Sequence, residues 1–414
     1  MTFTIKQIFL SLLFLYGYQA YPATIEVSKS GQNSIQKAID QANPHDTIVV
    51  LAGTYREHDI LIEKPLNIRG VGRPVIDAGH AGQIIVVGSD SVAISGFQIQ
   101  NVGFSFTKDW AAILIDNKNY CRIEDNILVD AYYGIYLKKS NHIVIRGNRL
   151  EGKAENEINS GNGIHLWYCD SILIENNHIK GHRDGIYFEF VENSTIVRNT
   201  SEANVRYGLH FMFSNNDDYI GNTFKNNGTG VAVMFSEHIN MINNHFIDNW
   251  GTTNYGLLFK EISDGELSGN LFKNNTVGIF ADGTNRMKIS KNEFVENGWA
   301  MNVFSNCMNN EIVDNNFISN TFDLITNSAK HHNHYHHNYW DQYSGYDLDK
   351  DGIGDVPHRP VKLFSYLIGK VPESIILLRS FFIDIINMAE KVAPVLTPES
   401  LMDEQPRMKI ITDD

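Results

Sequence analysis

Two methionines and a histidine stand at outward positions of two successive sequence repeats. Residues 208–213 read GLHFMF and correspond to GVAVMF at residues 230–235. The apolar residues of both segments alternate, which predicts strands with one buried face. His210, Met212 and Met234 fall on the opposite face. Because thioether and imidazole groups are soft ligands that suit Cu(I), we predict a copper site here. Packing of these side chains beneath an insert or the tail is the alternative.

A second group of possible ligands is a run of five histidines within seven residues. These are His331, His332, His334, His336 and His337. Such a density is typical of transient Cu or Zn binding. Because successive residues of a strand point to opposite faces, the run does not predict a closed site with four ligands.

A third group consists of carboxylates on alternate residues around a glycine turn, in the segment DLDKDGIGD. The candidate ligands are Asp347, Asp349, Asp351 and Asp355. Their spacing matches the first positions of a loop that binds Ca²⁺ through oxygen ligands. The distal Glu that usually completes such a loop is missing, and His358 stands in its place. A structural Ca²⁺ site and a plain Asp-Gly turn both fit this pattern.

Regularly spaced asparagines identify the repeat that must position these residues. They are Asn126, Asn148, Asn177, Asn199, Asn222, Asn244, Asn270, Asn292, Asn315 and Asn338, and the intervals run from 22 to 29 residues. Short alternating strands fill the intervals, without helical stretches. This pattern predicts an all-β fold, a right-handed parallel β-helix. A buried Asn at each bend can bond to the Asn of the next coil.

Glycines open most strands and set the alignment of the coils. They are Gly134, Gly163, Gly185, Gly208, Gly230, Gly256 and Gly278. The fourth residue after each of the central glycines gives the series Trp167, Glu189, Met212, Met234 and Lys260. Since parallel rungs lie about 4.8 Å apart, Met212 and Met234 should be vertical neighbours on the exterior. His210 should lie beside Met212 on the same face.

The two ends of the chain depart from the repeat. Residues 1–23 hold Lys6, a short apolar run and small residues at Ala20 and Ala23, which is typical of a secretory signal. Residues 24–346 are expected to form the β-helix, with a short helix at residues 34–42 that covers its first coil. The mature chain is therefore expected to be exported and to be, at most, peripheral to a membrane.

Residues 347–414 combine the Asp-rich loop with an apolar helical tail. We predict one helix from Pro372 to Ala389, capped by Ser374 and ended before Pro394. Its apolar residues cover most of its circumference. Such a helix either caps the last coil or lies against a partner or a membrane surface. The residues predicted to contact a partner are Leu377, Leu378, Phe381, Phe382 and Ile385.

Charge and cysteine content exclude several classes of protein. The formal net charge is −14 at pH 7, and loss of residues 1–23, with their single Lys, would make it −15. An acidic surface offers no electrostatic basis for nucleic-acid binding. Cys121, Cys169 and Cys307 cannot all pair internally. Cys121 and Cys169 should lie two rungs apart, about 10 Å, which is beyond disulfide reach. Buried, inert thiols are therefore expected.

Several motifs together resemble the NosD family. They are the strands HFMFSN and VAVMFS, the segment NYWDQY, the loop DLDKDGIGDVPHRP and the C-terminal block LLRSFF…AEKVAPVLTPESL. The likeness covers essentially the whole mature chain, although so dense a histidine run at residues 331–337 departs from the family pattern.

The resemblance implies a periplasmic maturation factor without catalytic activity. It would assist assembly of the copper–sulfur centre of nitrous oxide reductase, and would receive Cu(I) on a few exposed ligands. The implied partners are the membrane and ATPase subunits of an ABC transporter, a copper chaperone lipoprotein and the reductase itself. On this reading the apolar tail becomes a dock onto the transporter.

Two other functional classes remain open. A β-helical polysaccharide lyase, hydrolase or epimerase would share the entry segment at residues 34–55, but needs clustered outward Asp residues, or a Lys or Arg base beside bound Ca²⁺. The outward positions here hold Tyr, His, Met, Trp and single acids. A sugar-binding module would use aromatic rings for stacking. The candidate rings are Trp110, Trp167, Tyr132, Tyr133 and Tyr187.

Overall fold

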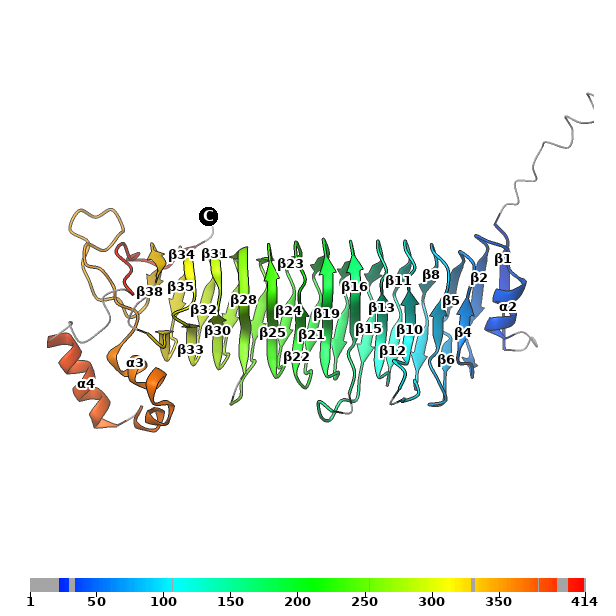
Figure 1. The fold of residues 1–414 in the computed structure, drawn as a ribbon, viewed down its shortest axis with the longest axis horizontal. Coiled ribbons are helices and arrows are strands. Elements are labelled where there is room, and N and C mark those ends of the chain that lie inside the picture. The colour runs from blue at the N-terminus through cyan, green and yellow to red at the C-terminus, as the bar shows by residue number, and fades with distance from the viewer. Residues whose placement is uncertain are drawn as a thin grey trace, which may run out of the picture.

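A computed structural model describes residues 22–29, 34–105, 107–158, 160–252, 254–328, 332–378, 380–392 and 401–412. Nearly all of the predicted secretory signal, residues 1–23, lies outside these ranges, and so does His331. The chain winds into a right-handed parallel β-helix, whose coils stack along the length of Figure 1. The predicted fold class is therefore confirmed.

Each complete coil contributes three strands, which build three faces. The first face contains β4 (Ile60–Ile62), β7 (Ile85–Val87), β10 (Ala111–Asp116), β13 (Tyr133–Lys138), β16 (Ile164–Asp170), β19 (Asp184–Glu192), β22 (Tyr207–Met212), β25 (Thr229–Glu237), β28 (Tyr255–Ser268), β30 (Val277–Asp282), β33 (Trp299–Val303) and β36 (Phe322–Ile325). This face carries the glycine-defined strands that hold the candidate copper ligands.

The second face follows the first around the coil. It contains β1 (Thr24–Val27), β2 (Thr47–Leu51), β5 (Asn67–Val71), β8 (Ala93–Ser95), β11 (Arg122–Glu124), β14 (Val144–Arg146), β17 (Leu173–Glu175), β20 (Thr195–Val197), β23 (Asp218–Ile220), β26 (Asn240–Ile242), the end of β28, β31 (Asn285–Ser290), β34 (Met308–Val313) and β37 (His332–His336). Because β28 bends from the first face to the second, the two faces form one sheet of 25 strands.

The third face closes each coil and forms a separate sheet of 13 strands. It contains β3 (Thr54–Tyr55), β6 (Val75–Asp77), β9 (Gln98–Gln100), β12 (Ile127–Val129), β15 (Arg149–Glu151), β18 (His178–Lys180), β21 (Thr200–Glu202), β24 (Thr223–Lys225), β27 (His245–Ile247), β29 (Leu271–Lys273), β32 (Glu293–Val295), β35 (Asn316–Ile318) and β38 (Tyr339–Trp340). All pairings that the strands make from coil to coil run parallel, such as Leu209 with Val231 in the first sheet and Phe224 with Phe246 in the second.

The core is a column of inward side chains that stack from coil to coil. On the third face the rings of Phe246, Phe272, Phe294, Phe317 and Trp340 stack with centroids 4.0 to 4.9 Å apart. All five side chains are buried. Burial of one such side chain contributes about 2–3 kcal/mol, and a single coil could not exclude water from it alone. Stacking is therefore the condition for stability.

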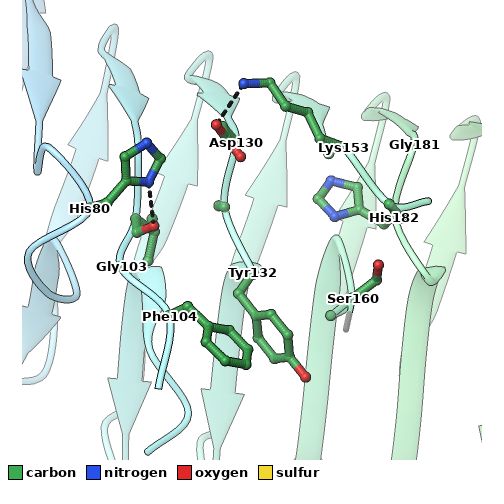
Figure 2. Close-up of a pocket in the computed structure, with 14 residues that line it drawn as sticks. His80, Gly103, Phe104, Asp130, Tyr132, Lys153, Ser160, Gly181 and His182 are labelled. Atoms are coloured by element: carbon green, nitrogen blue, oxygen red, sulfur yellow. Dashed lines mark hydrogen bonds and ion pairs between the residues drawn. The ribbon is translucent and has the colours of Figure 1, made fainter. Parts of the chain in front are cut away.

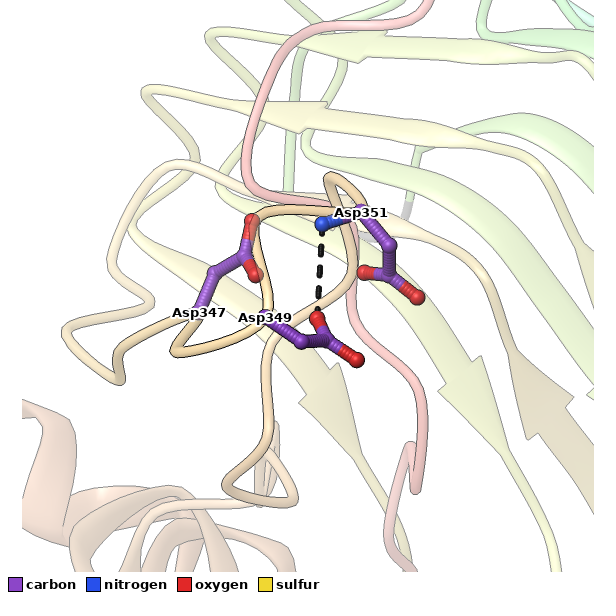
Figure 3. A group of neighbouring side chains, drawn as sticks. All are labelled: Asp347, Asp349 and Asp351. Carbon is purple, nitrogen blue, oxygen red and sulfur yellow. Dashed lines mark hydrogen bonds between the residues drawn. The ribbon is translucent and has the colours of Figure 1, made fainter.

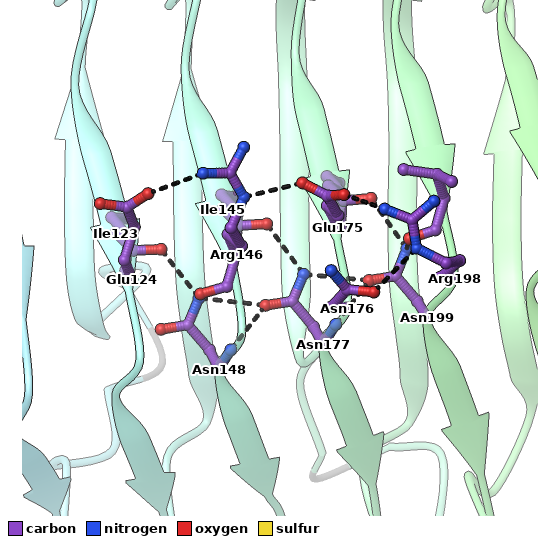
Figure 4. Close-up of polar contacts among 12 residues, drawn as sticks. Ile123, Glu124, Ile145, Arg146, Asn148, Glu175, Asn176, Asn177, Arg198 and Asn199 are labelled. Atoms are coloured by element: carbon purple, nitrogen blue, oxygen red, sulfur yellow. Dashed lines mark hydrogen bonds and ion pairs between the residues drawn. The ribbon is translucent and has the colours of Figure 1, made fainter.

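The buried asparagines form a ladder along the corner between the second and third faces (Figure 4). The Nδ2 atom of Asn148 donates to Oδ1 of Asn177 at 3.0 Å, and Asn177 repeats this bond to Asn199. The same oxygens also accept backbone N–H groups of the preceding Asn. This arrangement satisfies the polar groups of a buried bend, as the spacing predicts. Outside it, Arg146 and Arg198 both pair with Glu175.

A helix covers the first coil, as predicted. It is α2 (Ile35–Gln41), and the Ser34 hydroxyl caps it by accepting the N–H of Lys37 at 3.1 Å. Ile35 and Ile39 turn toward the coil and are buried. The helix therefore shields the apolar column at its N-terminal end.

The C-terminal tail differs from the predicted single helix. It contains α3 (Leu363–Lys370), the 3₁₀ helix η1 (Pro372–Leu377) and α4 (Phe381–Val392). The Ser374 hydroxyl donates to the carbonyl of Val371 at 2.6 Å and does not cap a helix. The break between η1 and α4 allows α3 and α4 to pack together over the last coil, where Ile383 joins Phe322 and Phe364 in a buried cluster. Tertiary burial thus overrides the helical pattern.

Residues 401–412 return to the end of the β-helix and complete the asparagine ladder. Asp403 is fully buried, and its Oδ2 atom accepts the backbone N–H and the side-chain N–H of Asn338, both at 3.1 Å. The indole N–H of Trp340 donates to the same oxygen at 3.0 Å. A carboxylate from a distant segment therefore occupies the place of the next asparagine. Across the residues described above, no helix is long and apolar enough to cross a membrane.

Candidate copper-binding face

The two methionines lie next to each other on the exterior of the first face. Met212 in β22 and Met234 in β25 are register partners on neighbouring coils, and both are partly exposed. Rungs of a parallel sheet are about 4.8 Å apart, so the two thioethers project from adjacent positions of one column. The repeat alignment predicts this placement from the glycine positions, because the side-chain period of two leaves only one face for each residue.

Oppositely charged residues bracket the methionine pair. Glu189 is the register partner of Met212 on the preceding coil, and Lys260 is the register partner of Met234 on the following coil. Trp167 precedes Glu189 in the same column. The column therefore presents two adjacent soft donors between one anion and one cation, rather than a cluster of like charges.

His210 lies on the same strand as Met212, two residues earlier, but it is not exposed. Only 6% of its surface is accessible, because the rings of Tyr187 and Tyr207 pack against it with centroids 5.1 and 4.8 Å away. Neither ring nitrogen has a hydrogen-bond partner. Burial lowers the pKa of His210 to about 4, so the imidazole is neutral at physiological pH. The expectation of an exposed His210 ligand is therefore wrong.

A buried, unpartnered imidazole is energetically unfavourable and marks a candidate functional group. An unmade hydrogen bond of a buried polar atom costs about 1–3 kcal/mol. A neutral imidazole with an available nitrogen is also the form that ligates transition metals. In this structure Tyr187 and Tyr207 cover the ring, so a metal could reach a nitrogen of His210 only if these rings moved.

A ladder of aromatic rings runs beside the methionine column and was not anticipated. Tyr168, Phe190, Phe213 and Phe235 stack with centroids 4.5, 5.1 and 5.2 Å apart. Tyr168, Phe213 and Phe235 are 40–47% exposed. Their separations of 22 or 23 residues contain the signal that would have identified them. Phe213 and Phe235 directly follow Met212 and Met234.

The aromatic ladder occupies an unfavourable backbone conformation. All four residues have φ values between 50° and 56°, in the left-handed region. This region is costly for bulky side chains and favours Gly, Asn and Asp. The same corner carries Lys139, Glu261 and Gly283 on other coils. These four coils place exposed or partly exposed rings at positions where residues with a lower conformational cost would serve the fold. The rings are therefore candidates for a surface role.

The histidine run lies on the second face, several coils beyond Met234. His332, His334 and His336 project outward from β37, and the Nε2 atom of His336 lies 3.3 Å from Glu311. The Nδ1 atoms of His336 and His337 are 3.2 Å apart. Within the described ranges, the histidines form no group of three convergent ligands. The run therefore extends along the strand instead of closing around one ion.

Three of the four candidate calcium ligands converge in the Asp-rich loop (Figure 3). Carboxylate oxygens of Asp347, Asp349 and Asp351 lie within 4.8 Å of one another. Asp347 also accepts the N–H groups of Lys350 and Gly352, at 2.6 and 2.9 Å. Such backbone bonds hold the loop in a turn and leave carboxylate oxygens free on its outer side.

Asp355 stands apart from this trio. Its Oδ2 atom accepts the backbone N–H of Leu348 at 2.6 Å and so closes the base of the loop. The carboxylate of Asp351 raises the pKa of Asp349, against the opposing effect of a hydrogen bond from the Asp351 amide. This repulsion between neighbouring carboxylates is the kind that a bound cation would relieve.

The apolar residues predicted to contact a partner are mostly exposed. Phe381 is 77% exposed, Phe382 52%, Ile385 49% and Leu377 37%. Leu378 instead packs against the buried cluster at the end of the coils. Ile376 and Met388, at 86% and 70% exposed, extend the same apolar surface. The tail therefore covers the last coil and also leaves apolar side chains exposed; contact of these side chains with a partner stays a prediction.

The cysteines take no part in the copper-binding face. Cys121, Cys169 and Cys307 are all free and buried. Burial raises the pKa of Cys169 to about 11, so the group is a thiol and not a thiolate at neutral pH. Since the thiolate is the form that ligates metals, these residues are inert, as the sequence predicts.

Solved structures of similar fold come from proteins of diverse kinds. A phage tailspike protein, Dettilon gp208, superposes with a TM-score of 0.59 over 74% of this chain and 69% of its own, at 15% identity. PfbA, a surface adhesin of Streptococcus pneumoniae, superposes with a TM-score of 0.54 over 73% of this chain and 91% of its own, at 13% identity. At such low identity these likenesses support the fold alone.

Relatives by sequence give more specific information than the structures of similar fold. The chain is 29% identical, over 136 residues, to a probable ABC transporter binding protein NosD of Pseudomonas aeruginosa. It is 25% identical, over the same length, to a protein of that name from Stutzerimonas stutzeri. The matched part spans about a third of this chain and a third of each relative.

A family model extends the likeness over most of the β-helix. The model described as "Periplasmic copper-binding protein (NosD)" matches residues 39–160 and 150–345. The matched residues include the methionine pair, His210 and the aromatic ladder. The chain therefore belongs to the NosD family of periplasmic copper-binding proteins.

Proposed function

We propose that this protein receives Cu(I) in the periplasm and passes it on during assembly of the copper–sulfur centre of nitrous oxide reductase. It acts as a maturation factor without catalysis of its own. The observation that carries the proposal is the register of Met212 with Met234, beside the neutral imidazole of His210. The family's description as copper-binding supports the choice of metal.

The donor set suits transfer better than storage. Thioether sulfur and imidazole nitrogen are soft enough to select Cu(I). The face offers no thiolate, because all three cysteines are buried. A partner with stronger ligands can therefore remove the ion by exchanging one ligand at a time. The half-exposed methionines receive it first, and His210 completes the site as Tyr187 and Tyr207 move aside.

The aromatic ladder gives the exchanging protein a place to bind. Ligand exchange requires the partner's ligands to come within bonding distance of the methionine sulfurs, so the partner must contact the residues around them. Phe213 and Phe235 are next in sequence to the two methionines and present exposed ring edges. We assign the aromatic ladder as the binding surface of the copper chaperone lipoprotein and of the reductase, which would bind there one after the other.

The apolar tail provides a separate contact with an ABC transporter. Its exposed surface, formed by Leu377, Phe381, Phe382 and Ile385, lies at the C-terminal end of the rod, away from the methionines. The name of the relatives, ABC transporter binding protein, supports this assignment. We assign the membrane subunit to this surface and the ATPase subunit to the far side of the bilayer.

Ca²⁺ at Asp347, Asp349 and Asp351 would have a structural role. The histidine run would bind Cu or Zn weakly.

Anaerobic titration of the purified chain with Cu(I), in competition with a chromogenic chelator, tests the copper site. We expect Met212→Leu and Met234→Leu each to weaken binding by about tenfold or more, since each removes one sulfur ligand and about 1.4 kcal/mol or more of binding free energy. Met241→Leu is the matched control, because Met241 is buried in the core of β26.

Three results would count against the proposal. Unchanged Cu(I) affinity in both outer methionine variants would remove the assigned ligands. Cleavage or epimerisation of oligosaccharides by the wild-type chain would instead place the protein among the β-helical enzymes. Equal losses in Met241→Leu and the outer variants would indicate a general effect on folding and would count against the site as well.

A further inference from the structure

A cavity of about 660 Å³ lies at the corner between the third and first faces, before the methionine pair along the rod. Residues 102–104, 152–154 and 160–161, which leave the regular coil path, form much of its wall. Figure 2 shows side chains from several successive coils around this space. Its volume is within the range of small-molecule sites in proteins, which is about 300–1,000 Å³.

His182 lines this cavity with a ring nitrogen that lacks a hydrogen-bond partner. It is only 3% exposed, and its Nε2 atom has no hydrogen-bond partner. The imidazole faces the space enclosed by the other labelled residues (Figure 2). Burial lowers the pKa of His182 to about 4, so the ring is neutral and offers one donor and one acceptor. A buried polar atom without a partner indicates a group absent from the structure.

The remaining walls combine hydrogen-bonding groups with aromatic rings. Lys153 and Asp130 form an ion pair of 2.6 Å above His182, and the buried Ser160 lies below it. Phe104 and Tyr132 occupy another side, with ring centroids 5.4 Å apart and planes at 64°. The cavity therefore has an apolar aromatic side and several polar groups elsewhere.

This distribution selects a neutral ligand. Asp130 neutralises Lys153, and His182 is uncharged, so the site has no excess positive charge for an anion. The carboxylate and imidazole groups around the cavity are not among the described clusters that could hold a metal ion. A sugar ring has the matching chemistry, because its C–H face packs on aromatic rings while its hydroxyls exchange hydrogen bonds with neutral and paired groups.

We propose that this cavity binds a neutral carbohydrate of one or two sugar rings, with His182 as a hydrogen-bonding residue and Phe104 and Tyr132 as the stacking side. The site is distinct from the copper-binding face. It gives the rod a second ligand, so that the protein can contact a glycan independently of copper transfer.

Calorimetric titration of the full-length mature chain tests this proposal with four probes: glucose, N-acetylglucosamine, cellobiose and chitobiose. We expect saturable binding of at least one probe with a Kd of about 1 mM or tighter. His182→Phe and Tyr132→Leu should each weaken it by about tenfold, because the first removes the hydrogen bonds and the second the aromatic surface. His178→Phe, on the neighbouring outer surface of β18, should leave the affinity unchanged.

Three outcomes would overturn the proposal. They are the absence of saturable binding with all four sugars, binding that neither His182→Phe nor Tyr132→Leu weakens, and tighter binding of inorganic phosphate than of any sugar. Circular dichroism of each variant separates a lost site from a lost fold. Tyr132→Leu keeps the test decisive if His182→Phe unfolds the chain, since Tyr132 is only partly buried.

Discussion

At the scale of single residues, burial sets the protonation state of several histidines. Desolvation lowers the pKa of His165 to about 3, and those of His182, His210 and His358 to about 4. The neutral form suits the roles proposed for His182 and His210, because a neutral imidazole can ligate a metal or both donate and accept a hydrogen bond. These buried imidazoles therefore differ chemically from solvated histidines.

The lowered pKa of His182 predicts a loss of stability in mild acid. Its folded pKa of about 4 lies below the ordinary value of 6.5, so the unfolded chain takes up the proton first. The free energy of unfolding should therefore fall as the pH drops from about 6.5 toward 4, by up to about 3 kcal/mol for this residue. Thermal melts between pH 7.5 and 4.5 measure the effect.

The variant His182→Phe supplies the control for this prediction. Phe cannot be protonated, so the fall in melting temperature with acidification should be shallower in the variant than in the wild type. Parallel curves for the two proteins would show that His182 does not titrate in this way. His334→Phe, at an exposed position of β37, controls for the introduction of a Phe side chain.

At the scale of the elements, the asparagine ladder holds the corners of successive coils in register. Asn222 is fully buried, and its Oδ1 atom accepts two hydrogen bonds from Asn199, at 2.9 and 3.0 Å. Its Nδ2 atom donates to the carbonyl of Ile196 at 2.8 Å and to Asn244 at 3.0 Å. Each asparagine therefore satisfies groups on both neighbouring coils, which links the coils cooperatively.

Replacement of a central ladder residue should be strongly destabilising. Asn222→Ala removes the acceptor of the backbone N–H of Asn199, one acceptor of the Asn199 side chain and a donor to the carbonyl of Ile196. We expect this loss to cost about 3 kcal/mol or more. Urea denaturation followed by circular dichroism measures the loss. Asn226→Gly should be tolerated, because Asn226 is exposed and its φ of 53° favours glycine. Similar losses in both variants would contradict a specific role for the ladder.

At the scale of the whole molecule, the rod keeps its surfaces apart. The coils that line the cavity at His182, the coils of Met212 and Met234, and the apolar tail follow one another along the axis of the rod in Figure 1. A stacked solenoid contacts only its neighbours from coil to coil, so distant coils keep a fixed separation. The proposed contacts with a transporter, a copper-exchanging protein and a glycan would therefore not compete for one surface.

Substitutions of exposed tail residues should weaken partner binding without changing the stability of the fold. Phe381→Ser and Met388→Ser alter side chains that are 77% and 70% exposed, so the melting temperature should change little. Co-purification with the transporter's membrane subunit in detergent should fall by about tenfold or more if each removed side chain lies at the interface. Leu348→Ser, at an exposed position outside the tail, is the matched control. Undiminished co-purification would remove the tail from the interface.

Short-range periodicity was sufficient to predict the coils and the outer column. The 22-residue period and the alternation within strands specify which residues stack, since a slip of one residue would turn every side chain to the wrong face. The neighbouring positions of Met212 and Met234, the buried asparagines, the first helix and the buried cysteines follow from these local rules.

Features outside the repeat were decided by tertiary contacts. Tyr187 and Tyr207 bury His210 through ring packing between coils, and Asp403 completes a ladder from 65 residues away. The break before α4 and the cavity at His182 likewise arise from segments that follow no period. A local pattern cannot specify such contacts, because their free energy depends on surfaces that exist only after the coils have stacked.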